Sequence, residues 1–444
     1  MGPPFVDGCP IPAENLNRLA TTSINVQNYL PSGQPDGTTD NSPAIQAMID
    51  AVCSRSPPGG DIHFVAATYV VHDVNINCSG IHLVGIASPD ATVVDYSLAT
   101  DHGLKFAPNG FPAITPSQWL YGNGVENITF RSSGGKTRAL DFDGFNSGYI
   151  NRISFSGSIY NGIRLYGGYG FDIENTLSSG YAGAVFTNMV IDLEGDLTGR
   201  NNSGDACILA TCSTRTDFVK IGNLSSYGTS GTGLNIQGLV ATVYGEHIAL
   251  NVQNYGLVVS CRVDFPSIAY CPSFISFTDL ETEGALTFPI YMTDFTDFQC
   301  VGCYAFGSGA NLNVLYANLA NFSQNSSFGG GFRWKGGRLG AAQQMCVKLG
   351  VSDTKIDDAW IYNCNKSSDG YAGTEYFAGT QHSESNNTYC TVLGGVTSPS
   401  MAGSVVTDPA SKATFNTNSY WGCSSGVTTN GSPTNVNVYN SQGP

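Results

Sequence analysis

The sequence predicts an all-β solenoid, in which short parallel strands stack as rungs behind a single N-terminal helix. Three observations lead to this prediction. Residues 42–52 have a helical pattern that no later segment matches, the rest of the chain reads as short strands and turns, and a short apolar tripeptide recurs through the centre. At 444 residues the chain can bury a large core, and its 54 glycines suit tight corners between rungs.

The predicted helix follows a turn formed by Asp36–Asp40. Ser42 is expected at the N-cap and Pro43 at the first helical position. Four apolar residues then fall at the spacing of one helix face: Ile45, Met48, Ile49 and Val52. Gly59-Gly60 ends this unit, and residues 62–71 read as two strands.

The recurring tripeptides begin 22, 23, 26, 23, 33, 24 and 33 residues apart. They start at Ile163, Val185, Ile208, Leu234, Leu257, Ile290, Val314 and Val347. A basal repeat of 22 to 24 residues with occasional insertions is typical of a parallel β-helix. We therefore expect residues 126–365 to form stacked rungs with the eight tripeptides in one parallel sheet. The longer intervals place inserted loops near 261–273 and 318–331, beside a groove.

Residues 25–71 resemble the N-terminal part of the pectate-lyase-like right-handed β-helix superfamily. In that family a strand, an Asp-Gly-Thr turn and a helix with Ala-Ile-Gln-Ala precede a Gly-Gly turn and a strand ending near Gly-Thr-Tyr. This chain has Ala67 where the family has that last glycine. The resemblance implies a right-handed β-helix over residues 23–385. It leaves the reaction open, because the superfamily includes lyases, hydrolases, epimerases and bacteriophage tailspikes.

These observations divide the chain into four segments. Residues 1–22 are an N-terminal arm, 23–125 the cap and first rungs, and 126–385 the parallel β-helix. Residues 386–444 are rich in Ser, Thr, Asn and Val and carry almost no charge. We expect this last segment to be a β-rich cap over the open end or an oligomerisation region.

The composition argues against some classes of binding partner and cellular location for this protein. The formal net charge of −15 argues against nucleic acid and anionic membranes as partners, although a local basic patch would still allow an acidic glycan. No stretch approaches 18 apolar residues, so membrane insertion is not expected. No secretory signal is visible in residues 1–22, which favours a virion tail acting outside the cell over a mature secreted enzyme with an added Met.

The 13 cysteines are spread along the chain. Buried free thiols are the favoured interpretation, with some disulfides if the protein lives outside a cell. Cys300 and Cys303 have the spacing of metal ligands, but no second such pair exists and no zinc site is expected.

Acidic residues suggest a catalytic site. Tyr244 and Phe277 each precede the next apolar tripeptide by 13 residues, which places Glu246 beside Asp279 on adjacent rungs, about 4.8 Å apart. Glu281 shares that face if the strand continues. Stacked carboxylates repel, so one is expected to act as the acid and another as the base of glycoside hydrolysis. The alternatives are a solvated acidic face and a Ca²⁺ site that uses Asp279, Glu281 and Glu283.

The remaining candidates would bind substrate. They are Tyr244, Arg262, Asp294, Asp297, Arg333, Trp334 and Lys335. Arg333-Trp334-Lys335 with Arg338 forms the one basic-aromatic cluster, which could hold an anionic sugar or supply the base of a lyase. Glu174 would extend the acidic line, and His247 is expected on the opposite face from Glu246 as an ordinary core or edge histidine.

The expected function is binding and depolymerisation of a bacterial capsular polysaccharide or exopolysaccharide by a glycoside hydrolase of phage tailspike type. The alternatives are a lyase that acts by β-elimination on a uronic-acid glycan and an adhesin without catalysis. The resemblance implies a homotrimer. No cofactor or metal is expected, with Ca²⁺ as the one candidate ion.

Overall fold

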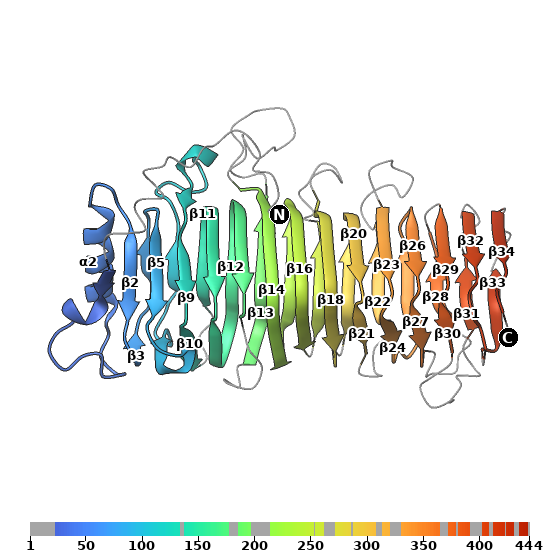
Figure 1. Cartoon of the computed structure of the whole chain (residues 1–444), viewed down its shortest axis with the longest axis horizontal. Coiled ribbons are helices and arrows are strands. Elements are labelled where there is room, and N and C mark those ends of the chain that lie inside the picture. Colours follow the sequence, from blue (N-terminus) through green and yellow to red (C-terminus); the bar gives the residue numbers. More distant parts are fainter. Residues whose placement is uncertain are drawn as a thin grey trace.

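Parallel strands wind into one long coil, with the N-terminal helix across one end and the C-terminal strands at the other (Figure 1). This computed structural model describes residues 23–133, 137–176, 185–196, 214–252, 254–261, 271–285, 287–307, 313–319, 330–364, 372–378, 381–390, 402–407, 412–421, 423–429 and 435–442. Within these residues, hydrogen bonds connect 34 strands into one sheet, and the registered strand pairs between neighbouring rungs are parallel. The predicted β-helix is confirmed.

Each rung has three faces, which strand β12 (Ser154–Glu174) defines because it passes through all of them. Its residues 154–159 lie on face C, 161–166 on face A and 168–174 on face B. The other strands that turn from one face to another are β11 (Arg138–Asn151), β13 (Val185–Gly195), β14 (Thr216–Thr229), β16 (Val240–Val252) and β18 (Ser273–Glu283).

The remaining strands belong to single faces. Face A holds β4 (Val74–Ile76), β7 (His102–Phe106), β15 (Thr232–Gly238), β17 (Tyr255–Ser260), β19 (Phe288–Thr293), β22 (Leu315–Asn318), β25 (Val347–Gly350), β28 (Ala372–Tyr376), β31 (Ala402–Val406) and β33 (Ser425–Thr429). Face B holds β1 (Ser23–Asn25), β2 (Gly60–Phe64), β5 (Ile81–Gly85), β8 (Leu120–Tyr121), β9 (Gly124–Glu126), β20 (Thr296–Val301), β23 (Gly330–Lys335), β26 (Thr354–Asp357), β29 (His382–Ser385), β32 (Lys412–Asn416) and β34 (Asn435–Tyr439). Face C holds β3 (Ala67–Val70), β6 (Thr92–Asp95), β10 (Thr129–Ser133), β21 (Tyr304–Phe306), β24 (Arg338–Gly340), β27 (Trp360–Tyr362) and β30 (Thr388–Tyr389).

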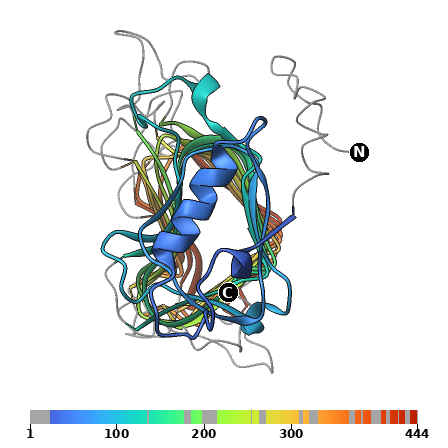
Figure 2. The ribbon, with the colours of Figure 1, turned by 90° about the vertical axis from the view of Figure 1, so that its left-hand side faces the viewer.

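Helix α2 (Ser42–Cys53) lies across the open N-terminal end of the coil (Figure 2). The predicted apolar stripe of Ile45, Met48, Ile49 and Val52 is buried, as an amphipathic helix that closes a core requires. Asn41 is the N-cap instead of Ser42, whose hydroxyl accepts a hydrogen bond from the His72 amide at 2.9 Å. Short 3-10 helices occur at η2 (Val26–Asn28), η3 (Pro89–Ala91) and η4 (Pro116–Gln118). In the described part of the chain, none of the helices is both long and apolar enough to cross a bilayer.

Most of the predicted repeat is confirmed on face A. The tripeptides that begin at Ile163, Leu234, Leu257, Ile290 and Val347 share one register. Two predictions were wrong because the connections between rungs differ in length. Leu315, not Val314, pairs with Ile290, and Ile191, not Val185, pairs with Ile163. The tripeptide at 208–210 lies outside the described residues.

A single residue in the left-handed conformation turns the chain from face B to face C. This corner recurs along the coil with φ between +49° and +69°, at Asn127, Arg152, Asn175, Asn223, His247, Asp279, Gly302, Gly336, Asp358, Asn386, Thr417 and Asn440. Asn, Asp and Gly tolerate this conformation best, which explains why they dominate the corner. A residue just after the corner therefore faces a different direction from a residue just before it.

Cysteine pairs fasten the rungs, so the expectation of free thiols was wrong for ten of them. The described residues form five disulfides: Cys53–Cys78, Cys261–Cys271, Cys300–Cys303, Cys346–Cys364 and Cys390–Cys423. Stacking brings together cysteines that are up to 33 residues apart in the sequence. Disulfides persist in oxidising surroundings, which is consistent with a protein that acts outside the cell.

The described part of residues 386–444 continues the same coil. Strands β31 and β33 extend face A, and β32 and β34 extend face B. At this end Trp421 is 59% exposed, Val438 51% and Tyr439 53%.

Candidate active site

Charged side chains gather on the outer side of face A where β7, β11, β12 and β13 lie side by side. Alternation along each strand points Leu140, Ile163 and Ile191 into the core and their neighbours outward. The outward positions form what we call the Arg164 cluster: Lys105, Asp141, Asp143, Arg164, Tyr166, Asp192 and Glu194.

Arg164 holds the cluster together. Its Nη1 lies 2.8 Å from Asp143 Oδ1 and 3.0 Å from Asp141 Oδ1. Its Nε lies 2.9 Å from Glu194 Oε2, so one guanidinium joins carboxylates on both sides of its own rung. Lys105 Nζ adds a contact of 3.0 Å to Asp143 Oδ2. Burial alone would lower the pKa of Arg164, but the surrounding carboxylates outweigh it and raise that pKa, so the guanidinium stays charged.

Two carboxyl groups of the cluster have perturbed acidity. Burial raises the pKa of Asp143 to about 6, and the charge of Asp141 adds to that effect. Burial also raises the pKa of Asp192 to about 7, with a further contribution from the charge of Glu194. A hydrogen bond with the Glu194 side chain also favours the protonated form of Asp192.

The surroundings fix the orientation of this pair. Asn235 Nδ2 donates a hydrogen bond to Asp192 Oδ1 at 2.8 Å from the next rung. Asp192 is only 3% exposed, whereas the side chain of Glu194 is 23% exposed and reaches the surface. Glu194 is therefore the member of the pair that a bound molecule would meet.

An aromatic wall stands beside the cluster. Arg164 Cζ lies 4.5 Å from the centroid of the Tyr166 ring, and the Tyr166 hydroxyl donates a hydrogen bond of 2.7 Å to Asp196 Oδ2. The Phe111 ring packs edge-on against Tyr166, with centroids 5.4 Å apart. Phe111 belongs to the segment between β7 and β8, which rises above the rungs with η4 (Figure 1).

Gly144 lets this segment approach. It has φ +59°, and a Cβ added there would lie 2.9 Å from Phe111 Cδ2 and 3.0 Å from Pro108 Cγ. We expect Gly144→Ala to destabilise the protein by about 1–2 kcal/mol more than Gly122→Ala, because only the first adds a clash to the left-handed strain. Gly122 has a similar φ of +62° and nothing within 4 Å of the added Cβ, which makes it the matched control. Denaturant unfolding measures both variants, and equal losses would contradict the contact.

Of the three carboxylates that the sequence singled out, Glu246 and Asp279 lie at one exposed corner, whereas Glu281 lies on another face. The predicted alignment of Glu246 with Asp279 was wrong by one residue, because Glu246 pairs with Thr278 and Asp279 lies opposite His247. The cause is the connection from β18 to β19, which is one residue longer than the matching connection one rung earlier. Glu281 follows the left-handed corner at Asp279 and therefore lies on face C, in register with Tyr304.

Glu246 and Asp279 form an exposed corner with the histidine between them. His247 Nε2 lies 3.6 Å from Glu246 Oε1, and His247 Nδ1 lies 3.3 Å from Asp279 Oδ2. The side chain of His247 is 57% exposed, that of Glu246 59% and that of Asp279 52%. His247 thus joins this corner, contrary to the expectation that it faces away. Since Asp279 and Glu281 lie on different faces, they do not form a ligand set for Ca²⁺ with Glu283, and the described residues contain no metal-binding group of three or more His, Cys, Asp or Glu.

The predicted substrate-binding residues separate in the same way. Tyr244 is 51% exposed on face B. Asp297 is exposed at a second left-handed corner of the rung. Partial burial of its carboxyl group raises its pKa, and the charge of Arg333 opposes this shift. Two predictions were wrong: Trp334 is 1% exposed with its ring in the core, and Asp294 is 0% exposed. Arg262 lies outside the described residues.

Arg333 and Lys335 project outward on face B, on either side of the buried Trp334. Tyr244 lies three rungs away from Arg333 in the same outward row, about 14 Å along the coil. They therefore do not act on one sugar together.

A signal for the Arg164 cluster existed in the sequence. Arg164 interrupts the apolar tripeptide 163–165, and Asp141 and Asp143 alternate with Leu140 and Phe142. Once the register is known, charged residues at the same outward position of successive rungs can be recognised as one surface cluster.

Searches among family models and among curated proteins found no match. Similar solved structures include tailspike protein 3 of bacteriophage CBA120, with a TM-score of 0.59 and 12% identity over 97% of this chain and 63% of the tailspike chain. A DFA-IIIase of Arthrobacter chlorophenolicus in complex with GF2 gives 0.52 and 10% over 89% and 94% of the two chains. PfbA, a surface adhesin of Streptococcus pneumoniae, gives 0.50 and 15% over 91% of each chain. The chain is therefore a right-handed parallel β-helix protein, as the resemblance to the pectate-lyase-like superfamily implied.

Proposed function

We propose that this protein binds and hydrolyses a polysaccharide, with the Arg164 cluster as its catalytic centre. The observation that carries the proposal is the buried Asp192 beside the more exposed Glu194, which Arg164 holds opposite Asp141 and Asp143 on the outside of a β-helix. Perturbed carboxyl groups in such a setting are typical of acid–base catalysis. The similarity in fold to a tailspike, a DFA-IIIase and an adhesin supports a role on glycans.

Glycoside hydrolysis needs one carboxyl group that protonates the leaving oxygen and one carboxylate that activates water or attacks the sugar. The Asp192–Glu194 pair supplies the proton, and Glu194 delivers it because its side chain reaches the surface. Asp143 is the base. It lies two rungs from Glu194 in the same outward row, about 9.6 Å away at the Cα atoms, and the Arg164 guanidinium lies between the two carboxyl groups.

These roles predict a bell-shaped dependence of kcat/KM on pH. Asp143 with a pKa of about 6 must be ionised, and Asp192 with a pKa of about 7 must be protonated. The value of kcat/KM is therefore expected to be highest between about pH 6 and 7 and to fall on both sides. A pH–rate profile measures this, and a value of kcat/KM that rises steadily to pH 9 would contradict the assignment of Asp192 as acid.

The reaction is tested by a panel of bacterial capsular polysaccharides and exopolysaccharides. Reducing ends and the absorbance of unsaturated uronates are followed together. The proposal expects reducing ends alone. Both signals would show a lyase, and retained binding with neither would show an adhesin.

We propose further that the protein is a homotrimer on a virion tail and acts on a bacterial surface polysaccharide. The exposed Trp421, Val438 and Tyr439 at the C-terminal end of the coil are suited to a subunit contact. Light scattering is expected to give about 140 kDa, three times the chain mass of 46.8 kDa. A monomer at micromolar concentration would favour a secreted single-chain enzyme.

A further inference from the structure

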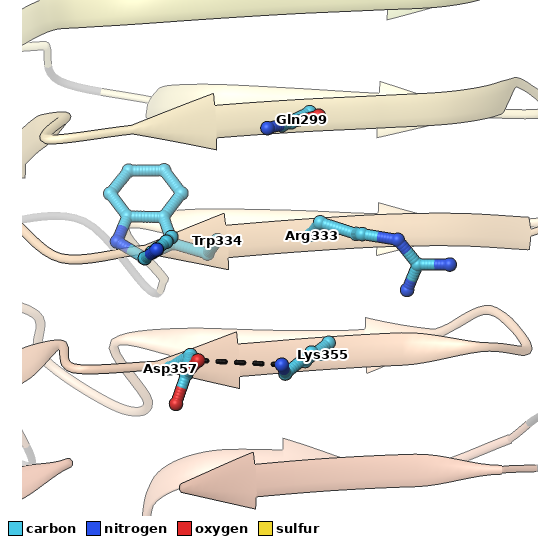
Figure 3. A pocket seen from close by; sticks show the side chains of 6 residues that line it. Gln299, Arg333, Trp334, Lys355 and Asp357 are labelled. Carbon is cyan, nitrogen blue, oxygen red and sulfur yellow. Dashed lines mark ion pairs between the residues drawn. The ribbon is translucent and has the colours of Figure 1, made fainter. Parts of the chain in front are cut away.

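A cluster of cations lies on face B, well away from the Arg164 cluster. Arg333 and Lys355 stand opposite each other on β23 and β26, and Lys335 stands opposite Asp357. With Gln299 on β20 and the backbone around the buried Trp334, they line a shallow pocket of about 110 Å³. Figure 3 shows Arg333 and Lys355 projecting from neighbouring strands, with Gln299 on the strand beyond.

The charges of this pocket are unusual for the chain. The protein has 19 basic against 34 acidic residues, yet three cations share two rungs that lie about 4.8 Å apart. Arg333 Nη2 contacts Asp353 Oδ2 at 2.8 Å, and Lys355 Nζ contacts Asp357 Oδ2 at 3.4 Å. Lys335 forms no ion pair within the described ranges. Arg333 and Lys355 are thus each paired with a carboxylate, and Lys335 is the cation left to attract an added anion.

The pocket is separate from the proposed catalytic centre. Five successive strand pairings lead from β12 through β14, β16, β18 and β20 to β23. The Arg333 rung is therefore about 24 Å along the coil from the β12 rung that carries Arg164, and it faces another side. A ligand in this pocket does not touch the Asp192–Glu194 pair.

We infer that this pocket binds an acidic group of a glycan, a carboxylate or a sulfate, and so holds the chain at a second site. The inference rests on the proposed function for the glycan nature of the ligand. A guanidinium forms paired hydrogen bonds with carboxylate and sulfate oxygens, and the two ammonium groups add attraction without fixed geometry. The Gln299 amide can bind neighbouring hydroxyl groups, since it both donates and accepts.

The same outward row extends the site along face B. From the pocket toward the N-terminus it carries Gln299, Ser276 and the exposed Tyr244. Small polar side chains followed by an aromatic ring leave a shallow strip parallel to the coil, in which a linear glycan could continue beyond its acidic group.

The experiment compares polymers that share one backbone. Affinity electrophoresis and titration calorimetry use carboxymethyl dextran, dextran sulfate and neutral dextran. We expect binding to one or both charged polymers, weakening with added salt, and none to neutral dextran. A triple variant with Arg333→Gln, Lys335→Gln and Lys355→Gln should bind at least about 10-fold more weakly. Lys335→Gln alone should weaken binding, whereas Lys412→Gln, which removes an exposed lysine of face B outside the pocket, should not.

Each result decides between the sites. Equal binding by the triple variant and the wild type would overturn the inference, and so would equally tight binding of DNA through the same three residues. Asp192→Asn is expected to bind the charged dextrans normally. If the protein hydrolyses no polysaccharide but binds the charged dextrans, and the triple variant weakens that binding, the proposed catalysis fails and this binding site is supported. If the protein hydrolyses a polysaccharide and the triple variant binds the charged dextrans as the wild type does, only this binding site is refuted.

Discussion

Asp192→Asn and Glu194→Gln are each expected to lower turnover by at least about 10²-fold, the usual scale for a positioned proton-transfer group. Asp192→Asn removes the proton that Asp192 is proposed to supply, and Glu194→Gln removes the group proposed to deliver it, each with little change in side-chain shape. Polysaccharide binding should change little, because neither residue is assigned to hold the glycan. Initial rates of reducing-end release measure the effect, and melting temperatures confirm that the variants fold.

The matched control is Glu375→Gln. Glu375 is also an outward, buried carboxylate of face A, and Lys348 Nζ pairs with its Oε2 at 3.1 Å, but it lies several rungs beyond the cluster. Its variant should keep full turnover. Unchanged turnover in both cluster variants would remove them from the mechanism, and loss in Glu246→Gln instead would place the chemistry at the corner of faces B and C.

Glu384 is expected to make the unfolding free energy fall as pH rises. Its carboxyl is buried in the core and accepts hydrogen bonds from the hydroxyls of Tyr376 at 2.9 Å, Tyr389 at 2.7 Å and Ser404 at 3.0 Å. Burial raises its pKa from 4.5 to about 7 even so. The folded state thus holds this proton more tightly than the unfolded state. The full contribution is present below about pH 4.5 and is lost as pH rises through about 7, a change of about 3 kcal/mol.

Glu384→Gln should remove this share of the pH dependence, because an amide does not titrate in this range. Urea unfolding at pH 5 and pH 8 measures the effect in the wild type and the variant. Asp90→Asn, which alters an exposed carboxyl, is the control and should leave the difference unchanged. A wild type that is more stable at pH 8 than at pH 5 would contradict the burial of a protonated Glu384.

Local patterns in the sequence were enough to predict the fold. The apolar stripe of α2 depends on neighbours within a few residues and was found as expected, as were five of the eight tripeptides on face A. The spacing failed where one extra residue entered a connection, as between β18 and β19. Because the register was counted backward from β19, this extra residue shifted all of β18 by one position, and Asp279 lies opposite His247 instead of Glu246.

The site depends on contacts that the sequence does not display. Lys105, Arg164 and Glu194 are far apart in the chain, and only the stacking of β7, β11, β12 and β13 brings their charges together. The same holds for the disulfide between Cys390 and Cys423. Trp334 shows the opposite error, because its place between two basic residues suggested a surface, whereas strand alternation turns it into the core.

The most direct test is a crystal structure of the Asp192→Asn variant with an oligosaccharide of its polysaccharide. The account predicts a sugar chain on the outside of face A beside Tyr166 and Phe111, with a glycosidic oxygen within about 3 Å of the Glu194 carboxyl group. An oligosaccharide whose scissile bond lies instead beside Glu246 and Asp279, with the Arg164 cluster empty, would contradict it.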